Sequence, residues 1–136
     1  MADDCIFCAI AERTAPAEVV QADSHTIAFL DINPATRGHT LVIPRKHATN
    51  LLEVDEEDLH RVASMAREIA SRMPDALGAQ GVNLLNSCGA AAWQTVNHFH
   101  LHVIPRYDDD PLKLPWIPGE HPAHADELAR VAEELR

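Results

Sequence analysis

Three histidines alternate with apolar residues in the run His98-Phe99-His100-Leu101-His102-Val103-Ile104. Side chains two residues apart point to the same face of a β-strand, so this spacing predicts a strand with Phe99, Leu101 and Val103 facing a core. The imidazoles would then form a row on the opposite face. A neutral imidazole offers a lone pair near pH 7 and can attack an acyl or phosphoryl centre. The row therefore favours nucleophilic catalysis, in which a neighbouring imidazole assists the leaving group.

A metal site and a solvated polar face are two other interpretations of this row. On an extended strand the Cα atoms of His98 and His102 stand roughly 13 Å apart, whereas a zinc–nitrogen bond is only about 2.0–2.1 Å long. At most two of the three histidines can therefore share one ion, which leaves at least one for other chemistry. A purely solvated row is disfavoured because buried polar groups in folded proteins are usually partnered.

Cys5 and Cys8 form a C-x-x-C pair near the N-terminus. Such a pair can be redox-active, can supply half of a zinc site, or can be two buried thiols. The redox interpretation requires a thioredoxin-like βαβ unit, which the surrounding residues do not predict. Zinc requires two further ligands, for which His47 and His98 are candidates. Cys88 lies in a predicted loop and is assigned no role.

The helices that must position these residues follow from hydrophobic periodicity. Residues 55–73 predict the longest helix, with Asp55 as its cap and Pro74 as the residue that ends it. Its apolar stripe consists of Leu59, Val62, Met65, Ala66, Ile69 and Met73. A short helix is predicted over 5–12 and an amphipathic helix over 124–136. Three residues of this last helix are expected to face inward: Leu128, Val131 and Leu135.

Short strands and turns make up most of the remaining sequence. Apolar and β-branched residues predict strands over 18–21, 25–30, 40–43, 81–86 and 98–104. Turn residues between the first two strands favour a hairpin. A proline-rich tail follows Arg106 and contains Pro111, Pro115, Trp116 and Pro118. An extended tail of this kind can lie across a neighbouring subunit.

The composition restricts the class of partner. The chain has 136 residues, enough for one self-sufficient domain, and its apolar content of 46% is ordinary for a globular protein. Its 11 Lys and Arg against 21 Asp and Glu give a net charge of −10, which argues against nucleic acid or a membrane surface as the main partner. No apolar run approaches the roughly 18 residues of a membrane span, and the acidic N-terminus lacks signal-peptide features. Three cysteines argue against a disulfide framework, so we expect a cytoplasmic protein.

The histidine run resembles the motif of the histidine triad (HIT) superfamily, in which three histidines alternate with apolar residues. Four other segments stand in the order and approximate spacing of that family: 5–8, 30–34, 38–47 and 94–96. The resemblance covers roughly residues 5–106, about three-quarters of the chain. Within the superfamily, the chain is similar to bacterial nucleotide hydrolases with an N-terminal C-x-x-C.

The resemblance implies an α+β fold. The expected architecture is an antiparallel sheet of about five strands with one long helix, a short N-terminal helix and a C-terminal helix. Residues 1–136 would form a single HIT domain with its core over 5–106 and its tail and last helix over 107–136. The family also implies a homodimer, in which C-terminal segments approach the partner's active site.

The resemblance also assigns roles to residues. His100 corresponds to the nucleophile, which forms a covalent nucleotidyl-histidine at the α-phosphate. His102 would bond a phosphate oxygen or the departing group, and His98 would bind zinc or orient His100. Residues expected to contact the nucleotide are Phe7, Asp31, Ile32, Ser87, Gln94 and Thr95. A purine nucleotide is preferred, with adenosine first, and both a phosphoramidate and a dinucleoside polyphosphate fit the same first step.

A structural zinc site is expected from a more distant resemblance to galactose phosphate uridylyltransferases. Its ligands would be Cys5, Cys8, His47 and His98. Closed four-ligand sites hold structure and perform no chemistry, so no cofactor is expected to be required for catalysis.

Two residues depart from the family pattern. Ser87 stands where relatives usually carry a phosphate-contacting asparagine, with Asn86 one residue earlier. Trp93 stands where many relatives carry glycine, which suggests an altered pocket mouth with a selective stacking surface. Two other functions remain open: a nucleotide-binding regulatory or scaffold protein with vestigial hydrolysis, and a metal-dependent hydrolase that uses the histidine row.

Overall fold

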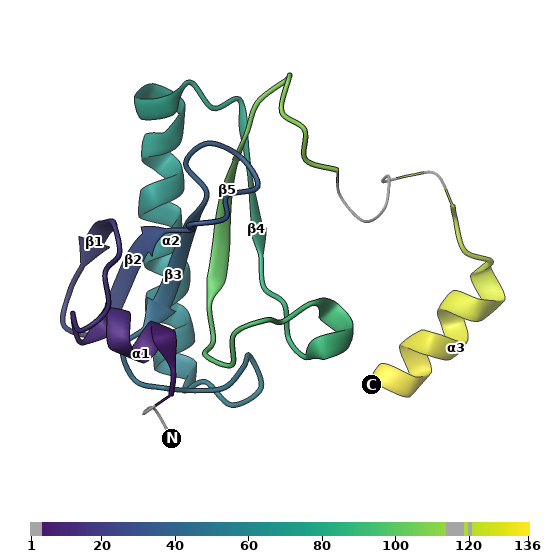
Figure 1. The fold of residues 1–136 in the computed structure, drawn as a ribbon. Coiled ribbons are helices and arrows are strands. Elements are labelled where there is room, and N and C mark those ends of the chain that lie inside the picture. The colour runs from purple at the N-terminus through teal and green to yellow at the C-terminus, as the bar shows by residue number, and fades with distance from the viewer. Residues whose placement is uncertain (1–3, 114–118, 120) are drawn as a thin grey trace.

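A five-stranded antiparallel sheet forms the centre of the protein, as seen in a computed structural model that describes residues 4–113, 119 and 121–136 (Figure 1). The strands are β1 (Val19–Ala22), β2 (Thr26–Leu30), β3 (Thr40–Pro44), β4 (Gly81–Leu85) and β5 (Leu101–Arg106), in the order β1-β2-β3-β5-β4. The helices are α1 (Ile6–Ala11), α2 (Glu56–Leu77) and α3 (Ala125–Leu135), with a short 3-10 helix η1 (Ala90–Ala92). The α+β fold expected from the sequence is therefore confirmed.

The sheet is covered by α2 on one face and by α1 on part of the other. The apolar stripe of α2 packs on Ala28, Val42, Phe99 and Val103, all buried. Neighbouring strand residues point the opposite way and pack on α1: Ile27, Phe29, Leu41 and Ile43. Because β2 and β3 are buried on both faces, they form a rigid base for the residues at their ends.

Helix α2 continues through Pro74, which was expected to end it. Proline removes one backbone N–H bond, and here that loss falls in the last turns of the helix. Met73 is buried and Leu77 packs beside the same core, so this contact offsets the lost bond. The helix ends at Leu77, and Gly78, with a φ of 74°, forms its left-handed C-cap.

The histidine run does not begin as a strand at His98. The ladder of β5 starts at Leu101, which pairs with Val42 of β3. Before it, the N–H of Phe99 donates to the carbonyl of Ala48 at 2.7 Å, a contact with a loop rather than a strand. Alternation continues through this segment, but His98 and His100 are buried at 0% and 4% exposure. These two histidines are therefore interior residues, whereas His102 is half-buried.

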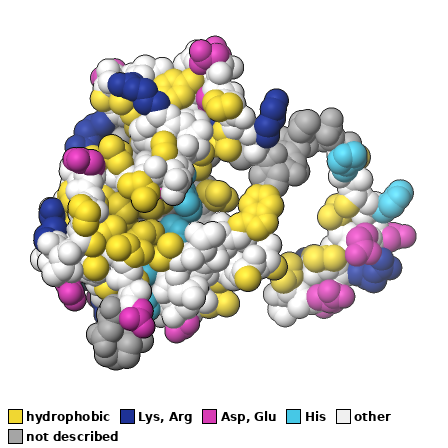
Figure 2. Space-filling model, in the orientation of Figure 1, with side chains coloured by type: hydrophobic (Ala, Val, Ile, Leu, Met, Phe, Trp, Pro, Cys, Tyr) yellow, Lys and Arg dark blue, Asp and Glu magenta, His cyan; other side chains and the backbone are white. Residues whose placement is uncertain are grey.

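The C-terminal helix α3 extends away from the sheet (Figure 1). No residue of α3 is buried, which contradicts the expectation that its apolar stripe faces inward. Leu128 and Leu135 are 58% and 83% exposed, and Figure 2 shows hydrophobic side chains on this separate helix. The amphipathic pattern predicted the helix correctly but did not specify what covers it. The expected tail residues Pro115, Trp116 and Pro118 lie outside the described residues.

Among the described residues, no helix is both long and apolar enough to cross a membrane.

Candidate functional site

A cavity of about 420 Å³ lies between α1, the end of β2 and the histidine run. Six of the residues singled out in the sequence line it: Phe7, Asp31, Ile32, Thr95, His100 and His102. Ser87 and Gln94 are not among its lining residues. The elements that build the wall are thus far apart in the chain and are brought together by the β2–β3–β5 pairing.

His100 presents a free ring nitrogen to this cavity. Its Nδ1 lies 2.7 Å from the carbonyl oxygen of His98, so Nδ1 carries a proton and donates it. In the neutral ring the lone pair is then on Nε2, which is the nucleophilic position. Phe7 stands edge-on against the ring at a centroid distance of 5.1 Å, which limits rotation of the imidazole.

A relay of two hydrogen bonds fixes the proton of His102. The backbone N–H of Ala35 donates to Nδ1 of His39 at 2.9 Å, so neutral His39 carries its proton on Nε2. That Nε2 lies 2.8 Å from Nδ1 of His102, which must accept. His102 is therefore protonated on Nε2 and offers an N–H donor next to His100, at a ring centroid distance of 4.9 Å.

His39 is a site residue that the sequence interpretation did not assign. It is 6% exposed and stands at the start of β3, with its Nε2 3.7 Å from the carboxylate of Asp31. Asp31, His39 and His102 also stand close enough together to hold a cation. However, the imidazole–imidazole hydrogen bond already uses the facing nitrogens of the two histidines. The only sequence signal for His39 was its place beside Gly38 and Thr40 in the resembling segment.

Burial keeps the imidazoles neutral. It lowers the pKa of His102 to about 4 and lowers the pKa of His100 and His39 below their ordinary value of 6.5. The neighbouring imidazoles of His100 and His39 lower the pKa of His102 further. The site therefore holds lone pairs and N–H donors at neutral pH, as nucleophilic attack requires.

We expect stability to decline in acid because of this burial. His102 binds a proton at pH 5 in the unfolded chain but not in the fold, so the unfolded state gains protons as the pH falls from 6.5 toward 4. The free energy of unfolding should be fully retained above pH 6.5 and should lose about 2 kcal/mol through this residue by pH 5. Urea unfolding at pH 7.5 and pH 5 measures this, and His102→Asn should flatten the dependence. If the free energy of unfolding changed equally with pH in the two proteins, the lowered pKa of His102 would not be the cause of the decline.

Gln94 and Asn86 support the site without lining it. The Gln94 side chain accepts from the N–H of Gly89 at 2.8 Å and donates to the carbonyls of Thr49 and Val96 at 2.7 and 3.0 Å. The Asn86 amide donates to the carbonyl of His100 at 2.9 Å. Asn86, which the sequence interpretation did not select, therefore positions the histidine run, while Ser87 is half-buried in the same loop.

Trp93 adopts a left-handed conformation directly after η1, with φ 69° and ψ 31°. A left-handed backbone costs an L-residue roughly 1–2 kcal/mol, and glycine avoids that cost. The structure thus gives a physical reason why glycine suits this position. The Trp93 side chain is 74% exposed, so packing does not compensate.

The four expected zinc ligands converge beside the cavity. Their ligand atoms all lie within 4.8 Å of one another. Cys5 Sγ and Cys8 Sγ lie 3.3 and 3.4 Å from Nδ1 of His98, and Cys8 Sγ lies 3.3 Å from Nδ1 of His47. Tetrahedral zinc with ordinary bond lengths places sulfur and nitrogen ligands about 3.5 Å apart. The arrangement therefore fits the ion.

The hydrogen bonds around this cluster also fit a metal. Nε2 of His98 lies 2.8 Å from the carbonyl of Pro44 and donates to it, which leaves the Nδ1 lone pair facing the thiols. Burial and the adjacent Cys5 raise the pKa of the Cys8 thiol to about 12, so a thiolate at this position requires a cation beside it. Cys5, Cys8 and Cys88 are free, so no disulfide competes for the pair.

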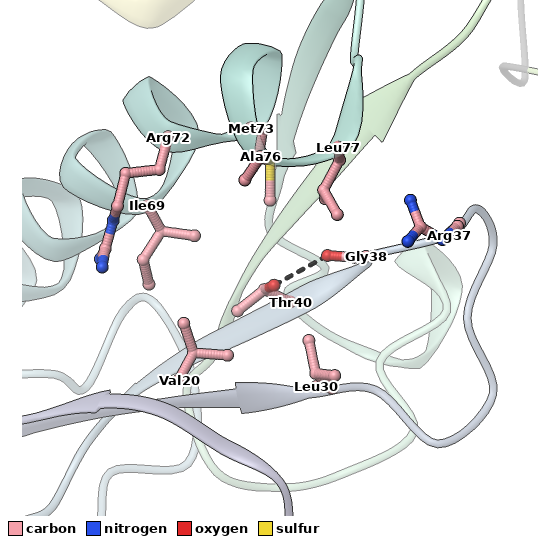
Figure 3. Close-up of a pocket in the computed structure, with 10 residues that line it drawn as sticks. All are labelled: Val20, Leu30, Arg37, Gly38, Thr40, Ile69, Arg72, Met73, Ala76 and Leu77. Atoms are coloured by element: carbon pink, nitrogen blue, oxygen red, sulfur yellow. Dashed lines mark hydrogen bonds between the residues drawn. The ribbon is translucent and has the colours of Figure 1, made fainter.

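A second groove of about 400 Å³ lies between α2 and the sheet (Figure 3). Apolar side chains such as Val20, Leu30 and Ile69 line it, and its basic groups are Arg37 and Arg72. The described residues that line it include no His, Cys, Asp or Glu, and the hydroxyl of Thr40 already donates to the carbonyl of Gly38 at 2.8 Å, so we do not assign catalysis to it.

Comparison with known proteins identifies the family. The family model of the HIT domain matches residues 12–109. The crystal structure of a HIT family protein from Bacillus anthracis has a TM-score of 0.88 and 38% identity, covering 99% of this chain and 96% of that one. A zinc-bound histidine triad family protein from Mycobacterium smegmatis has a TM-score of 0.79 and 40% identity, covering 87% and 86%. A histidine triad nucleotide-binding protein from Candida albicans has a TM-score of 0.84 and 28% identity, covering 97% and 94%.

These matches confirm the resemblance to the HIT superfamily that the histidine run indicated. The match spans most of the chain and includes the β2, β3 and β5 strands that build the cavity. On this evidence the chain belongs to the HIT family.

Proposed function

We propose that this protein is a nucleotide hydrolase or transferase that acts at the α-phosphate of a purine nucleoside phosphoramidate or dinucleoside polyphosphate. The observation that carries the proposal is the pair of fixed tautomers at the cavity. His100 holds a lone pair on Nε2, and His102 holds an N–H on Nε2 beside it. The nucleotide-binding relative of the same fold supports the substrate class.

Attack begins with Nε2 of His100 on the α-phosphorus. A nitrogen–phosphorus bond forms while the bond from phosphorus to the leaving group breaks, and its electron pair departs with that group. The Nδ1–H of His100, held by the carbonyl of His98, stays in place and accommodates the positive charge that the ring acquires. A polyphosphate departs as an anion and needs no proton, whereas an amine must take one from solvent.

His102 would stabilise the charge that gathers on the phosphoryl oxygens or on the departing group. One such preorganised donor is typically worth about 2.7–4 kcal/mol in the barrier. In the second half-reaction a water oxygen bonds to phosphorus and the nitrogen–phosphorus bond returns its electrons to Nε2. The proton of that water goes to bulk solvent, and a nucleoside monophosphate leaves.

The other cavity residues would hold the nucleoside. Asp31 is half-buried at the end of β2, where its carboxylate can accept from ribose hydroxyls, and the apolar Ile32 and Phe7 can cover the base. Thr95 lies on the wall and can reach the phosphate. Gln94 would act as a positioning residue, because its amide is already bonded to backbone groups.

The Cys5–Cys8–His47–His98 cluster would hold a structural zinc ion. Zinc here would tie α1 to the start of the histidine run and would take no part in bond breaking. Thiolate ligands require a reducing compartment, which supports a cytoplasmic location.

A homodimer is the assembly that we propose. Strand β4 is at the edge of the sheet, and Leu84 and Leu85 on it are 52% and 46% exposed. The exposed stripe of α3 is a second apolar surface that a second copy can cover.

Trapping the intermediate tests the proposed function. We expect that incubation with adenosine phosphoramidate or with diadenosine polyphosphate, followed by rapid quenching and mass spectrometry, shows adenylate on the peptide that contains His100. Nucleotide binding without any adduct or turnover would overturn hydrolysis and favour a regulatory or scaffold role instead.

A further inference from the structure

Trp93 combines an unfavourable backbone conformation with an exposed indole. Its φ is 69° and 74% of its side chain is exposed. Gly89, in the same loop, has φ 91°, but glycine lacks the Cβ that penalises this conformation. Strained positions of this kind cluster at active sites and ligand clamps, and the one other described non-glycine residue with a positive φ is Arg13, just after α1. Since the indole contributes little to packing within the described chain, its exposed face is available for a ligand.

Hydrogen bonds within the loop fix the backbone from which the Trp93 side chain projects. The backbone N–H of Trp93 donates to the carbonyl of Ala90 at 3.0 Å, and the backbone N–H of Gln94 donates to the carbonyl of Gly89 at 3.1 Å. The side-chain amide of Gln94 donates to the carbonyl of Thr49 at 2.7 Å and so anchors this turn. A rigid aromatic side chain loses little conformational entropy on contact, which favours its use in binding.

Trp93 is not itself a lining residue of the cavity that contains His100, but it lies two residues before one that is. Thr95 and Val96 line that cavity together with His100, and they also line an adjoining hollow of about 490 Å³. Trp93 precedes Thr95 by two residues, so their Cα atoms are at most about 7 Å apart. The groups proposed to hold the nucleoside, Asp31 and Ile32, come from the end of β2 instead.

We propose that Trp93 is a specificity-determining residue that stacks on an aromatic ring of the leaving group. The inference rests on the proposed function and narrows its substrate to a dinucleoside polyphosphate, whose second base would rest on the indole. In an in-line displacement the leaving group departs on the side opposite the nucleophile, so it moves away from His100. A nucleoside polyphosphate also departs without a proton, in keeping with a neutral His102.

Selectivity between two substrates tests this role. We expect Trp93→Gly to lower the ratio of kcat/KM for diadenosine polyphosphate over adenosine phosphoramidate by roughly 5- to 150-fold, the range for stacking one base on an aromatic side chain. Trp93→Tyr should retain most of the ratio. Leu52→Ala, at a side chain that is 84% exposed, is the matched control and should retain it fully.

Fluorescence gives a readout that does not depend on turnover. The chain has two tryptophans, so Trp116→Phe leaves only Trp93, whose emission should be quenched by adenosine triphosphate, a model of the leaving group.

The inference would be overturned if the ratio of kcat/KM for the two substrates did not change in Trp93→Gly, or if kcat/KM fell equally for both. A dimer that dissociates in Trp93→Gly by light scattering would also overturn it, because the indole would then be a subunit contact. If no substrate forms an adduct in the unmodified protein, the proposed function fails, and the quenching still decides whether Trp93 stacks on a base.

Discussion

Replacement of His100 by alanine should abolish nucleotidyl transfer while nucleotide binding survives. The proposed step forms a bond to Nε2 of this ring, and among the described residues of the cavity wall no other ring has its Nε2 lone pair fixed in this way. Removal of a nucleophile typically costs several orders of magnitude, so we expect kcat/KM to fall by at least about 10⁴-fold. The covalent adduct should disappear from the mass spectrum.

Binding and folding must be measured alongside this loss. His100→Ala removes one buried hydrogen bond and the contact with Phe7, which should cost about 1–3 kcal/mol of stability. Calorimetric titration with adenosine monophosphate should still show binding. His60→Ala, at a histidine that is 69% exposed on α2, is the matched control and should keep full activity. Adduct formation in His100→Ala would contradict the assignment of the nucleophile.

The parts of the fold that the sequence predicted are those set by local periodicity. The stripe on α2 repeats at helical spacing, and Phe99 and Val103 alternate with histidines, so both patterns assign a buried face without knowledge of the fold. Boundaries were less accurate where a distant contact decides them. The contact of Phe99 with Ala48 delays the start of β5, and the core contact of Leu77 carries α2 past Pro74.

In the candidate site, too, local sequence predicted some features and distant contacts decide the others. The sequence identified His100 and His102 as candidates for the reaction. Which nitrogen of each ring carries the proton depends on the N–H of Ala35 and on the carbonyl of His98. No linear pattern predicts such partners, because they meet only when β2, β3 and β5 pair. His39 was missed for that reason, since its bond to His102 crosses 63 positions of sequence. The pattern of α3 likewise specifies an apolar stripe but not the surface that covers it.

Loss of the proposed zinc ion should have the largest effect on stability. Cys8→Ala removes a buried ligand that lies within 3.4 Å of both His47 and His98. An ion at a thousand times its Kd stabilises a fold by about 4 kcal/mol, so we expect a loss of at least that size from the free energy of unfolding. Metal analysis of the protein purified under reducing conditions should show one zinc per chain, and none in Cys8→Ala.

The same substitution should also reduce activity indirectly. The carbonyl of His98 accepts the Nδ1–H of His100 and so keeps the lone pair of that ring on Nε2. If His98 is displaced, this acceptor is lost and the tautomer required for attack is no longer fixed. We therefore expect kcat to fall more than the affinity for adenosine monophosphate. Cys88→Ala is the matched control, because this free, half-buried thiol is not part of the cluster, and it should retain zinc, stability and activity. A Cys8→Ala protein with a full zinc content would show that the ion is held elsewhere, and a zinc-free native protein of full stability would show that the four side chains need no metal.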